Sequence, residues 1–589
     1  KVMMLSATPV NNRFNDLKNQ LALAYEGNPE GIDEKLETSG SIEQIFRRAQ
    51  KAFNAWSSLD PEDRTTDALL DVLHFDFFEI LDSLTIARSR KHITTYYDTA
   101  DIGEFPERNQ PLSIQSPLTD NEDVTYEHIA EQLTLLNLSV YSPLAYILPS
   151  KEKYYADLYD KDVGSSKLRQ KDRENSLRLL MRINLLKRIE SSVDSFRLTL
   201  ENIITQIEAC VKAIDSGSDK DLEGIQARVD GENFDWESNW GDEEHVIGKK
   251  VKVHVADMDT RRWKEDLSED LEILNALWNS VVDIRGERDM KLQDLISLLG
   301  NKIEKPLNPN NKKAIIFTAF ADTANYLYEN LAEHLKVTYG INTAIITGSR
   351  KVTNNKKIPA DLNTILTCFS PLSKGKDQVY PNLNEEIDLL IATDCISEGQ
   401  NLQDCDYLIN YDIHWNPVRI IQRFGRIDRL GSINTQIQLI NFWPNMELDE
   451  YINLQSRVSG RMVLLDISAT GEENVIDQNA SEMNDLEYRR KQLQQLKDTV
   501  VDLEDMTGGV SITDLTLNDF RMDLSDYINK DHGLVPGNSP STIKTQTMSK
   551  LAKAPLGLYS VVPLDEALKS EGMNEGVIFC LKNIFLKII

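Results

Sequence analysis

Four side chains in the segment QRFGRIDR have the types and spacing needed to handle a charged phosphate group: Gln422, Arg423, Arg426 and Arg429. Because Arg426 and Arg429 are three residues apart, we expect them to lie on one face of a helix. Fixed guanidinium groups stabilise the negative charge that develops on a γ-phosphate as it is transferred. The segment therefore predicts a domain that supplies catalytic arginines to a nucleoside triphosphate held between two domains.

A polar loop earlier in the chain contains further residues that could bind the same nucleotide. It contains Thr393, Asp394, Gly399 and Asn401, and it follows an apolar run that reads as a buried strand. In a parallel sheet, ligands collect at the carboxyl ends of the strands. Thr393 offers a hydroxyl group to a phosphate, Gly399 allows the backbone to approach a ligand, and Asn401 can hydrogen-bond a ribose. We expect this loop, including Asp394, to belong to the same nucleotide site.

Hydroxyl side chains that follow strand-like runs are candidates for contacts with nucleic acid. Ser6 and Thr8 belong to LSATPVNN, where such hydroxyls could relay between a nucleotide pocket and a nucleic-acid groove. Thr318, after the apolar run KAIIF, and Thr393 could each meet a backbone phosphate. The structural alternatives are a simple turn for Ser6 and Thr8, and a core strand with a polar exit for Thr318.

Short apolar runs rich in β-branched residues alternate with helical segments between residues 311 and 445. The runs span residues 314–317, 344–347, 388–393, 407–410 and 436–440. This alternation is typical of a parallel sheet with helices on both faces. The sequence therefore predicts an α/β fold for this part of the chain.

The chain as a whole divides into four parts by composition and pattern. These are a strand-like run with helical segments (1–100), a mostly helical part (101–310), the alternating α/β part (311–445) and a mixed, weakly patterned region (446–589). Within the mostly helical part, the apolar spacing predicts one long helix over residues 174–213. Its basic first half has two interpretations, a bundle helix with a solvated charged face or a helix that faces nucleic acid.

Composition excludes several classes of protein. No apolar run is long enough to span a membrane, and the five cysteines form no CxxC or Cys/His cluster, so we expect a reducing cytoplasm and no structural metal site. The formal net charge of −29 argues against a protein that is basic throughout. Any contact with nucleic acid must therefore use a local basic track.

The segments LSATPVNN, SEGQNLQ, WNP and QRFGRIDRLG together resemble the motifs of superfamily-two helicases. They are most similar to the Swi/Snf group of translocases, in its bacterial RapA-like branch. The resemblance covers residues 1–100 and 311–445 well and the remainder loosely. It implies two RecA-like lobes, the end of the first in residues 1–100 and the second in residues 311–445, with a helical insertion at 101–310 and an accessory region at 446–589. Ser6 and Thr8 would belong to motif III, residues 393–401 to motif V and residues 422–429 to motif VI. Arg426 and Arg429 would be the arginine fingers, and Gln422 would couple nucleotide state to nucleic acid.

The resemblance also implies ligands and partners. ATP with Mg²⁺ would be the cofactor, duplex DNA the nucleic acid, and RNA polymerase or the subunits of a defence system further partners. Two features depart from the family. Leu430-Gly431 is followed by Ser432 where the family has glutamine, and no GKT or GKS phosphate loop occurs in the sequence. We therefore expect a fragment that supplies the arginine-finger lobe and has negligible ATPase activity alone.

Two alternatives remain open at this level. The chain could be a catalytically inert, helicase-like scaffold that binds DNA or protein. It could also be the motor part of a restriction or phage-defence system.

Overall fold

The computed structural model describes the parts of the chain that carry most of the predicted elements: residues 41–57, 103–120, 124–163, 166–168, 170–217, 253–396, 400–413, 417–445, 496–497 and 499–500, with Lys18, Leu21, Phe77, Ile80, Arg90 and Ile93. All of them belong to the first of the two compact units of the chain, Lys1–Leu517. The predicted site residues Ser6, Thr8 and Gly399, and nearly all of the region 446–589, lie outside the described residues.

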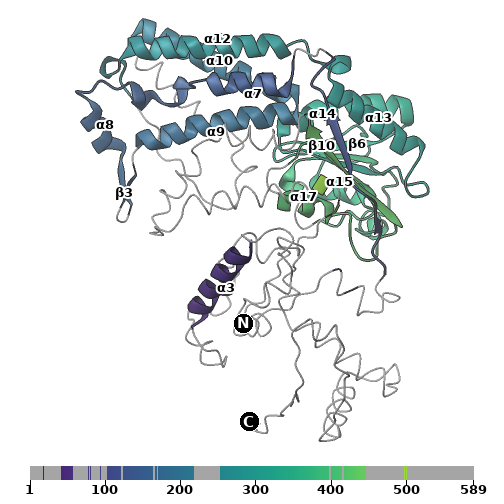
Figure 1. The fold of residues 1–589 in the computed structure, drawn as a ribbon. Helices are drawn as coiled ribbons and strands as arrows, with labels where there is room; N and C mark the ends of the chain where they lie inside the picture. The colour runs from purple at the N-terminus through teal and green to yellow at the C-terminus, as the bar shows by residue number, and fades with distance from the viewer. Residues whose placement is uncertain are drawn as a thin grey trace, which may run out of the picture. The chain divides into compact units, whose positions relative to one another are not determined.

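A mainly parallel sheet is the centre of the α/β domain (Figure 1). Its strands are β1 (Glu107–Arg108), β2 (Leu112–Ser116), β5 (Ala314–Phe317), β6 (Thr343–Ile346), β7 (Lys351–Thr353), β8 (Leu389–Ala392), β9 (Tyr407–Asn410) and β10 (Gln436–Pro444). Their order is β1-β10-β9-β5-β8-β6-β7, with β2 also beside β10. Among the described strands of this sheet, β7 alone runs antiparallel to its neighbour. The predicted α/β fold and its five strands are confirmed.

Helices cover both faces of this sheet. They are α13 (Met290–Glu304), α14 (Ala321–Tyr339), α15 (Leu362–Phe369), α16 (Lys376–Val379) and α17 (Pro417–Phe424). Successive side chains of a strand point to opposite faces, so Ile316 packs with the residues of α13 and α14 while Phe317 packs with those of α15 and α17. Burial on both faces explains why the strands read as continuous apolar runs.

The strand β2 shows that the sheet includes a segment that precedes the helical region. β2 runs parallel to β10, with Leu112 opposite Ile440 and Ser116 opposite Pro444. The Ser116 hydroxyl also donates a hydrogen bond at 2.6 Å to Asp294 on α13. The chain therefore contributes an edge strand to the sheet, leaves it for the helical region, and then returns to form the other strands.

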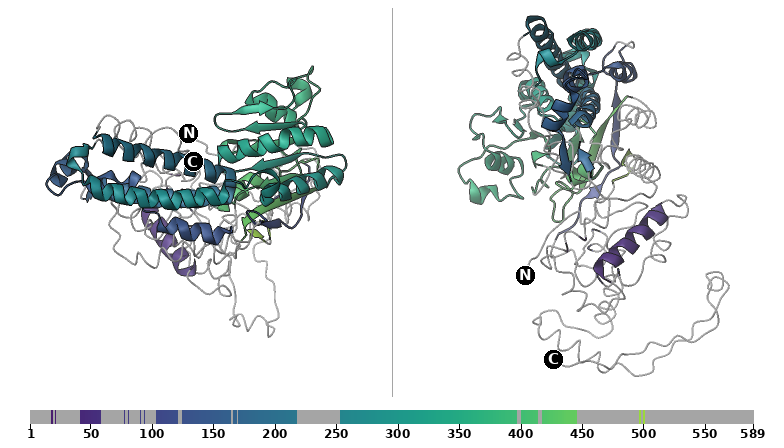
Figure 2. Two further views of the ribbon diagram at one scale, coloured as in Figure 1. Left: turned by 90° about the horizontal axis from the view of Figure 1, so that it is seen from above. Right: turned by 90° about the vertical axis from the view of Figure 1, so that its left-hand side faces the viewer.

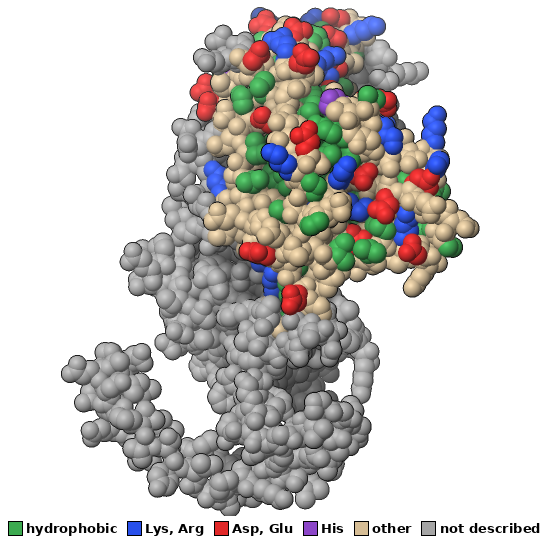
Figure 3. Space-filling view, turned by 90° about the vertical axis from the view of Figure 1, so that its right-hand side faces the viewer, with side chains coloured by type: hydrophobic (Ala, Val, Ile, Leu, Met, Phe, Trp, Pro, Cys, Tyr) green, Lys and Arg blue, Asp and Glu red, His purple; other side chains and the backbone are tan. Residues whose placement is uncertain are grey.

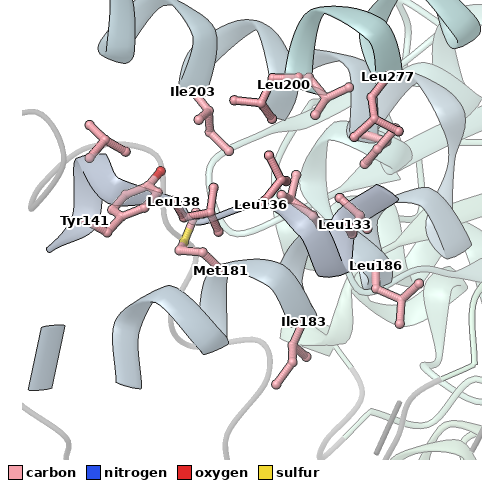
Figure 4. Close-up of a cluster of buried hydrophobic side chains, with 14 of the residues drawn as sticks. Leu133, Leu136, Leu138, Tyr141, Met181, Ile183, Leu186, Leu200, Ile203 and Leu277 are labelled. Carbon is pink, nitrogen blue, oxygen red and sulfur yellow. The ribbon is translucent and has the colours of Figure 1, made fainter. Parts of the chain in front are cut away.

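The long helices of the helical region lie side by side (Figure 2), and their core, part of which Figure 4 shows, also includes Ile420 and Ile421 of α17 and Trp443 of β10. Its elements are α7 (Tyr126–Leu135), α8 (Glu152–Tyr159), β3 (Lys161–Val163), β4 (Ser166–Leu168), α9 (Gln170–Ser191), α10 (Val193–Ser216) and α12 (Thr260–Val281). Leu133, Leu186, Leu200 and Leu277, each from a different helix, lie together in this core (Figure 4). The fully buried Asp270 accepts the backbone N–H groups of residues 137–139, which compensates for burying its charge.

The predicted long helix over residues 174–213 is wrong, because it is two helices that meet at Ser192. Ser192 has an extended backbone, and its hydroxyl caps α10 by accepting the N–H of Ser195 at 3.1 Å. The adjacent Ser191 hydroxyl donates to Asp412 of the α/β domain at 2.6 Å. The apolar spacing continues across the break, so the periodicity alone could not reveal it.

One further helix is described near the start of the chain, α3 (Ile42–Ser57), where the ring of Phe46 meets that of Phe77 edge to face at 5.5 Å. No helix among the described residues is long and apolar enough to cross a membrane. On the face shown in Figure 3, Lys and Arg side chains are interspersed with Asp and Glu. The described residues on that face therefore form no continuous basic track.

Candidate functional site

Arg423 joins the polar loop after β8 to the helix α17. Its Nε and one Nη donate hydrogen bonds to the two carboxylate oxygens of Asp394 at 2.6 and 2.8 Å, and its other Nη donates to Asn410 at 3.0 Å. Burial opposes the charge of Arg423, but the neighbouring Asp394 outweighs it and raises the pKa of Arg423. Such a bidentate pair fixes two segments against each other. Because Arg423 is 0% exposed, it is not accessible to a nucleotide in this arrangement.

Arg426 and Arg429 lie in the turn that follows α17, which ends at Phe424. The prediction that they share one face of a helix is therefore wrong. The N–H groups of Arg426 and Ile427 bond to carbonyls three residues earlier, at 3.1 and 3.0 Å, which tightens the chain out of α-helical geometry. Gly425, at the start of this turn, disfavours a continuing helix.

The turn is packed against the end of the polar loop. An Nη of Arg429 donates to Asn401 Oδ1, and its Nε donates to the carbonyl of Gly425 at 3.0 Å. The N–H of Leu402 donates to the carbonyl of Arg426 at 3.1 Å. Partial burial lowers the pKa of Arg429, and no carboxylate among the described residues pairs with it. The two segments that the sequence predicted as one site are thus brought together around Arg429.

A second contact holds the turn from the other side. The carboxylate of Asp428 accepts hydrogen bonds from Arg90 and, at 2.7 Å, from Arg108. The N–H of Gly431 donates to the carbonyl of residue 104 at 3.0 Å. A Cβ atom on Gly103, which has a φ of +89°, would lie 2.6 Å from the Cα of Gly431, so the two backbones approach too closely for a side chain. Residues 90, 103, 104 and 108 therefore hold the arginine turn in place. We call these contacts with residues 428–431 the Asp428 clasp.

Two of the three threonines predicted to contact nucleic acid, Thr318 and Thr393, are buried, and the third, Thr8, lies outside the described residues. Thr318 donates its hydroxyl to Asp412 and lies 3.2 Å from the hydroxyl of Ser191. Thr393 donates to the sulfur of Cys395 at 3.3 Å, and its N–H bonds to the carbonyl of Ile346 at 3.1 Å. Thr318 is 0% and Thr393 7% exposed, so neither hydroxyl presents itself to a groove in this structure.

The remaining predicted residue, Gln422, is half-buried on α17, and its Oε1 accepts no hydrogen bond from the residues that the structure describes. Three residues that sequence reasoning did not select organise the site: Asp412, Asp428 and Lys374. Asp412 and Asp428 lie within or next to the recognised motifs, which was a usable signal. For Lys374 the sequence offered no such signal beyond its place in a polar insertion, because the fold alone brings Lys374 next to the polar loop.

The arrangement suits the phosphate groups of a nucleotide better than it suits a metal ion. Arg429 supplies a half-buried positive charge held by a neutral amide, which can bind an anion without first losing a carboxylate partner. Among the described residues, no group of three His, Cys, Asp or Glu side chains could hold a metal ion. These residues could therefore bind the phosphates of ATP, but they offer no cluster of ligands for Mg²⁺.

Comparison with known proteins agrees with this geometry. Residues 290–431 match the family model of the helicase conserved C-terminal domain. These residues are thus homologous to the C-terminal domain of ATP-dependent helicases. The match includes the polar loop and the arginine turn.

Individual relatives cover limited parts of the chain. The uncharacterized ATP-dependent helicase YqhH of Bacillus subtilis is 42% identical over 140 residues, which are 24% of this chain and 20% of that protein. The RNA polymerase-associated protein RapA of Vibrio parahaemolyticus is 25% identical over 223 residues, 35% of this chain and 21% of RapA. The chain therefore spans about a fifth of the length of these relatives.

The helicase domain of Hef from Pyrococcus furiosus overlaps 68% of this chain and 65% of its own solved structure, with 14% identity and a TM-score of 0.30. This TM-score is too low to support a fold assignment. The assignment depends on the strand order and on the family match.

Proposed function

We propose that this chain supplies the arginine-finger lobe of an ATP-dependent motor that translocates on duplex DNA, of the Swi/Snf type and RapA-like branch. The observation that carries the proposal is the placement of Arg429 beside Asn401. This contact joins the polar loop to the arginine turn, both within the region matched by the helicase C-terminal domain. No carboxylate among the described residues pairs with the Arg429 guanidinium group. A relative named as associated with RNA polymerase supports the RapA-like branch and suggests RNA polymerase as a partner.

In this proposal Arg426 and Arg429 neutralise the charge that develops on the γ-phosphate. ATP, when bound, supplies the phosphoryl group, and this chain positions the arginines. The pair of Arg423 and Asp394 holds the polar loop against α17, and the Asp428 clasp holds the turn. Arg423 is thus proposed as a positioning residue and not as a nucleotide ligand. Gln422, just before the turn, would couple the nucleotide state of the motor to its binding of nucleic acid.

The other half of the catalytic site is proposed to lie in a part of the protein outside this chain. The sequence contains no GKT or GKS segment, which supports that proposal. The 589-residue chain alone should then hydrolyse ATP at a negligible rate. ATP hydrolysis by the purified chain that Arg426→Ala abolishes would contradict this expectation.

A comparison of nucleic acids tests the motor itself. We expect the ATPase rate of the full-length protein to rise when duplex DNA is added and to rise less with single strands. Directional movement of the protein should displace a third strand from a triplex ahead of it. An inert scaffold would bind DNA with no change in ATP hydrolysis, and that result would exclude the motor.

A further inference from the structure

Lys374 lies beside the arginine turn although it belongs to none of the helicase motifs. Its Nζ donates a hydrogen bond at 2.9 Å to Oε1 of Gln400, and the next residue, Asn401, accepts the hydrogen bond from Arg429. Burial and then the positive charge of Arg429 lower the pKa of Lys374. Two cations from distant parts of the sequence are thus held by adjacent amide side chains of one loop.

A dedicated buried carboxylate fixes the segment that carries Lys374. Asp404 is 2% exposed and accepts the N–H groups of Leu372 and Ser373 at 2.6 and 3.0 Å, as well as the hydroxyl of Ser373 at 2.6 Å. Gly375 has a φ of +60°, which a glycine adopts without strain, and the chain turns there into α16. The fold therefore fixes the position of Lys374, unlike that of a lysine on a freely solvated surface segment.

The charges around this pair are unbalanced. No described carboxylate pairs with Lys374 or Arg429, whereas Asp404 and Asp428 are each engaged by other groups. Holding two like charges together while partly burying them costs free energy unless an anion joins them. A solvated lysine on the surface would keep its hydration and would not need a buried carboxylate to position it. The pair therefore has the features of an anion site.

We propose that Lys374 binds the phosphate chain of the nucleoside triphosphate together with Arg429, as a further cation of the nucleotide site. This inference rests on the proposed function and deepens it, because Lys374 lies in the insertion between β7 and β8 and outside the recognised motifs. Lys374 would contribute affinity for the phosphates, and Arg429 would contribute to the transition state.

Binding of an unhydrolysed ATP analogue to the full-length protein tests the proposal. Isothermal titration with the β,γ-imido analogue of ATP compares the protein with Lys374→Gln and Lys374→Arg, and AMP is the second ligand. We expect Lys374→Gln to raise the Kd for the ATP analogue about tenfold, the effect of one charge-assisted hydrogen bond, and to leave the Kd for AMP unchanged. Lys374→Arg, which keeps the charge, should restore most of the affinity.

The matched control is Lys356→Gln, which removes an exposed lysine from the same insertion and should change neither Kd. Thermal unfolding of each variant verifies that the fold is kept. Protection supplies a second measurement, because the ATP analogue should slow the modification of Lys374 by trinitrobenzenesulfonate and leave that of Lys356 unchanged. Equal affinity of the Lys374→Gln variant and the unaltered protein for the analogue would overturn the inference. So would a loss of duplex-DNA binding with unchanged nucleotide affinity, which would assign Lys374 to nucleic acid.

Different results would contradict the proposed function and the assignment of Lys374. If Arg429→Ala hydrolyses ATP at the normal rate, the proposed function fails. If Arg429→Ala abolishes hydrolysis while Lys374→Gln binds the ATP analogue normally, the proposed function stands and the assignment of Lys374 alone is wrong.

Discussion

The hydroxyl of Ser191, at the break between α9 and α10, donates a hydrogen bond to the carboxylate of Asp412 at 2.6 Å. The same carboxylate accepts the hydroxyl of Thr318 and the N–H of Ala319, both directly after β5. The Nζ of Lys291 donates to the carbonyls of Glu190 and Ser191 at 2.6 and 3.0 Å. The helical region is therefore attached to the α/β domain through a buried polar joint. We expect the helical region and the α/β domain to move as one body during a nucleotide cycle.

Removal of Asp412 should weaken this joint. Asp412→Ala removes the acceptor shared by the hydroxyls of Ser191 and Thr318 and the buried N–H of Ala319, so we expect the free energy of unfolding to fall by about 3 kcal/mol. Denaturant titration followed by tryptophan fluorescence measures the change. The control Asp377→Ala, at an exposed position on α16, should change stability by less than about 0.5 kcal/mol. Equal stability of the two variants would contradict a structural role for Asp412.

Lys291 should make stability depend on pH. Burial lowers its pKa to about 8, although Asp412 and other acids oppose that shift. In the unfolded chain the pKa of lysine is about 10.4, so between these two values the unfolded state binds more protons than the folded state. The contribution of Lys291 to the free energy of unfolding must then rise with pH through this window.

The comparison with Lys291→Met isolates that contribution. We expect the stability of the unaltered protein, relative to the variant, to increase by about 2 kcal/mol between roughly pH 7.5 and pH 10. Denaturant titration at the two pH values measures it. A relative stability that falls as the pH rises would show that Lys291 is not held by burial in the way described.

Arg423 should behave as a residue of the structure, in contrast to Arg429. Arg423→Met removes the bidentate partner of Asp394, whose side chain is 11% exposed, so we expect the free energy of unfolding to fall by about 3 kcal/mol. Lysine should not restore the stability, because it cannot make both bonds. The double variant R423M/D394L removes both charges and should recover part of the loss, as measured by thermal unfolding. If the double variant is no more stable than R423M, then the pair is not what holds the loop to α17.

The Asp428 clasp should keep the arginine turn ordered. Asp428→Asn weakens the bonds from Arg90 and Arg108, so we expect the amides of residues 425–431 to exchange with solvent about tenfold faster. Amides of β5 provide the internal reference and should be unaffected. Hydrogen exchange read by mass spectrometry distinguishes this local effect from general unfolding. Unchanged exchange in the turn would show that the Gly431 contact alone is sufficient.

The strands of the α/β domain were predictable because burial on both faces requires continuous apolar runs, as in β5 and β8. The break at Ser192 was not predicted, although the Ser192 hydroxyl caps α10, and the adjacent Ser191 is held by Asp412, which is far away in the sequence. The apolar pattern of the two helices stays in phase across it.

The candidate site, too, was predictable only in part from the sequence. The pairing of the polar loop with residues 422–429 followed from the types and order of the residues. The burial of Arg423 and Thr318 did not, because a polar side chain gives no local sign of whether its partner will be a ligand or a neighbouring carboxylate. The neighbourhood of Lys374 depends on Asp404 and Gln400, which only the folded chain brings to it.

The proposed role of the arginine turn depends above all on the rate at which the full-length Arg429→Ala protein hydrolyses ATP. We predict a fall of about 10³-fold or more in kcat in the presence of duplex DNA, with the thermal stability of the α/β domain unchanged, because Arg429 acts on the transition state. The Lys356→Gln variant should keep the full rate. Hydrolysis by Arg429→Ala at the rate of the unaltered protein would contradict the proposal that this chain provides the arginine-finger lobe.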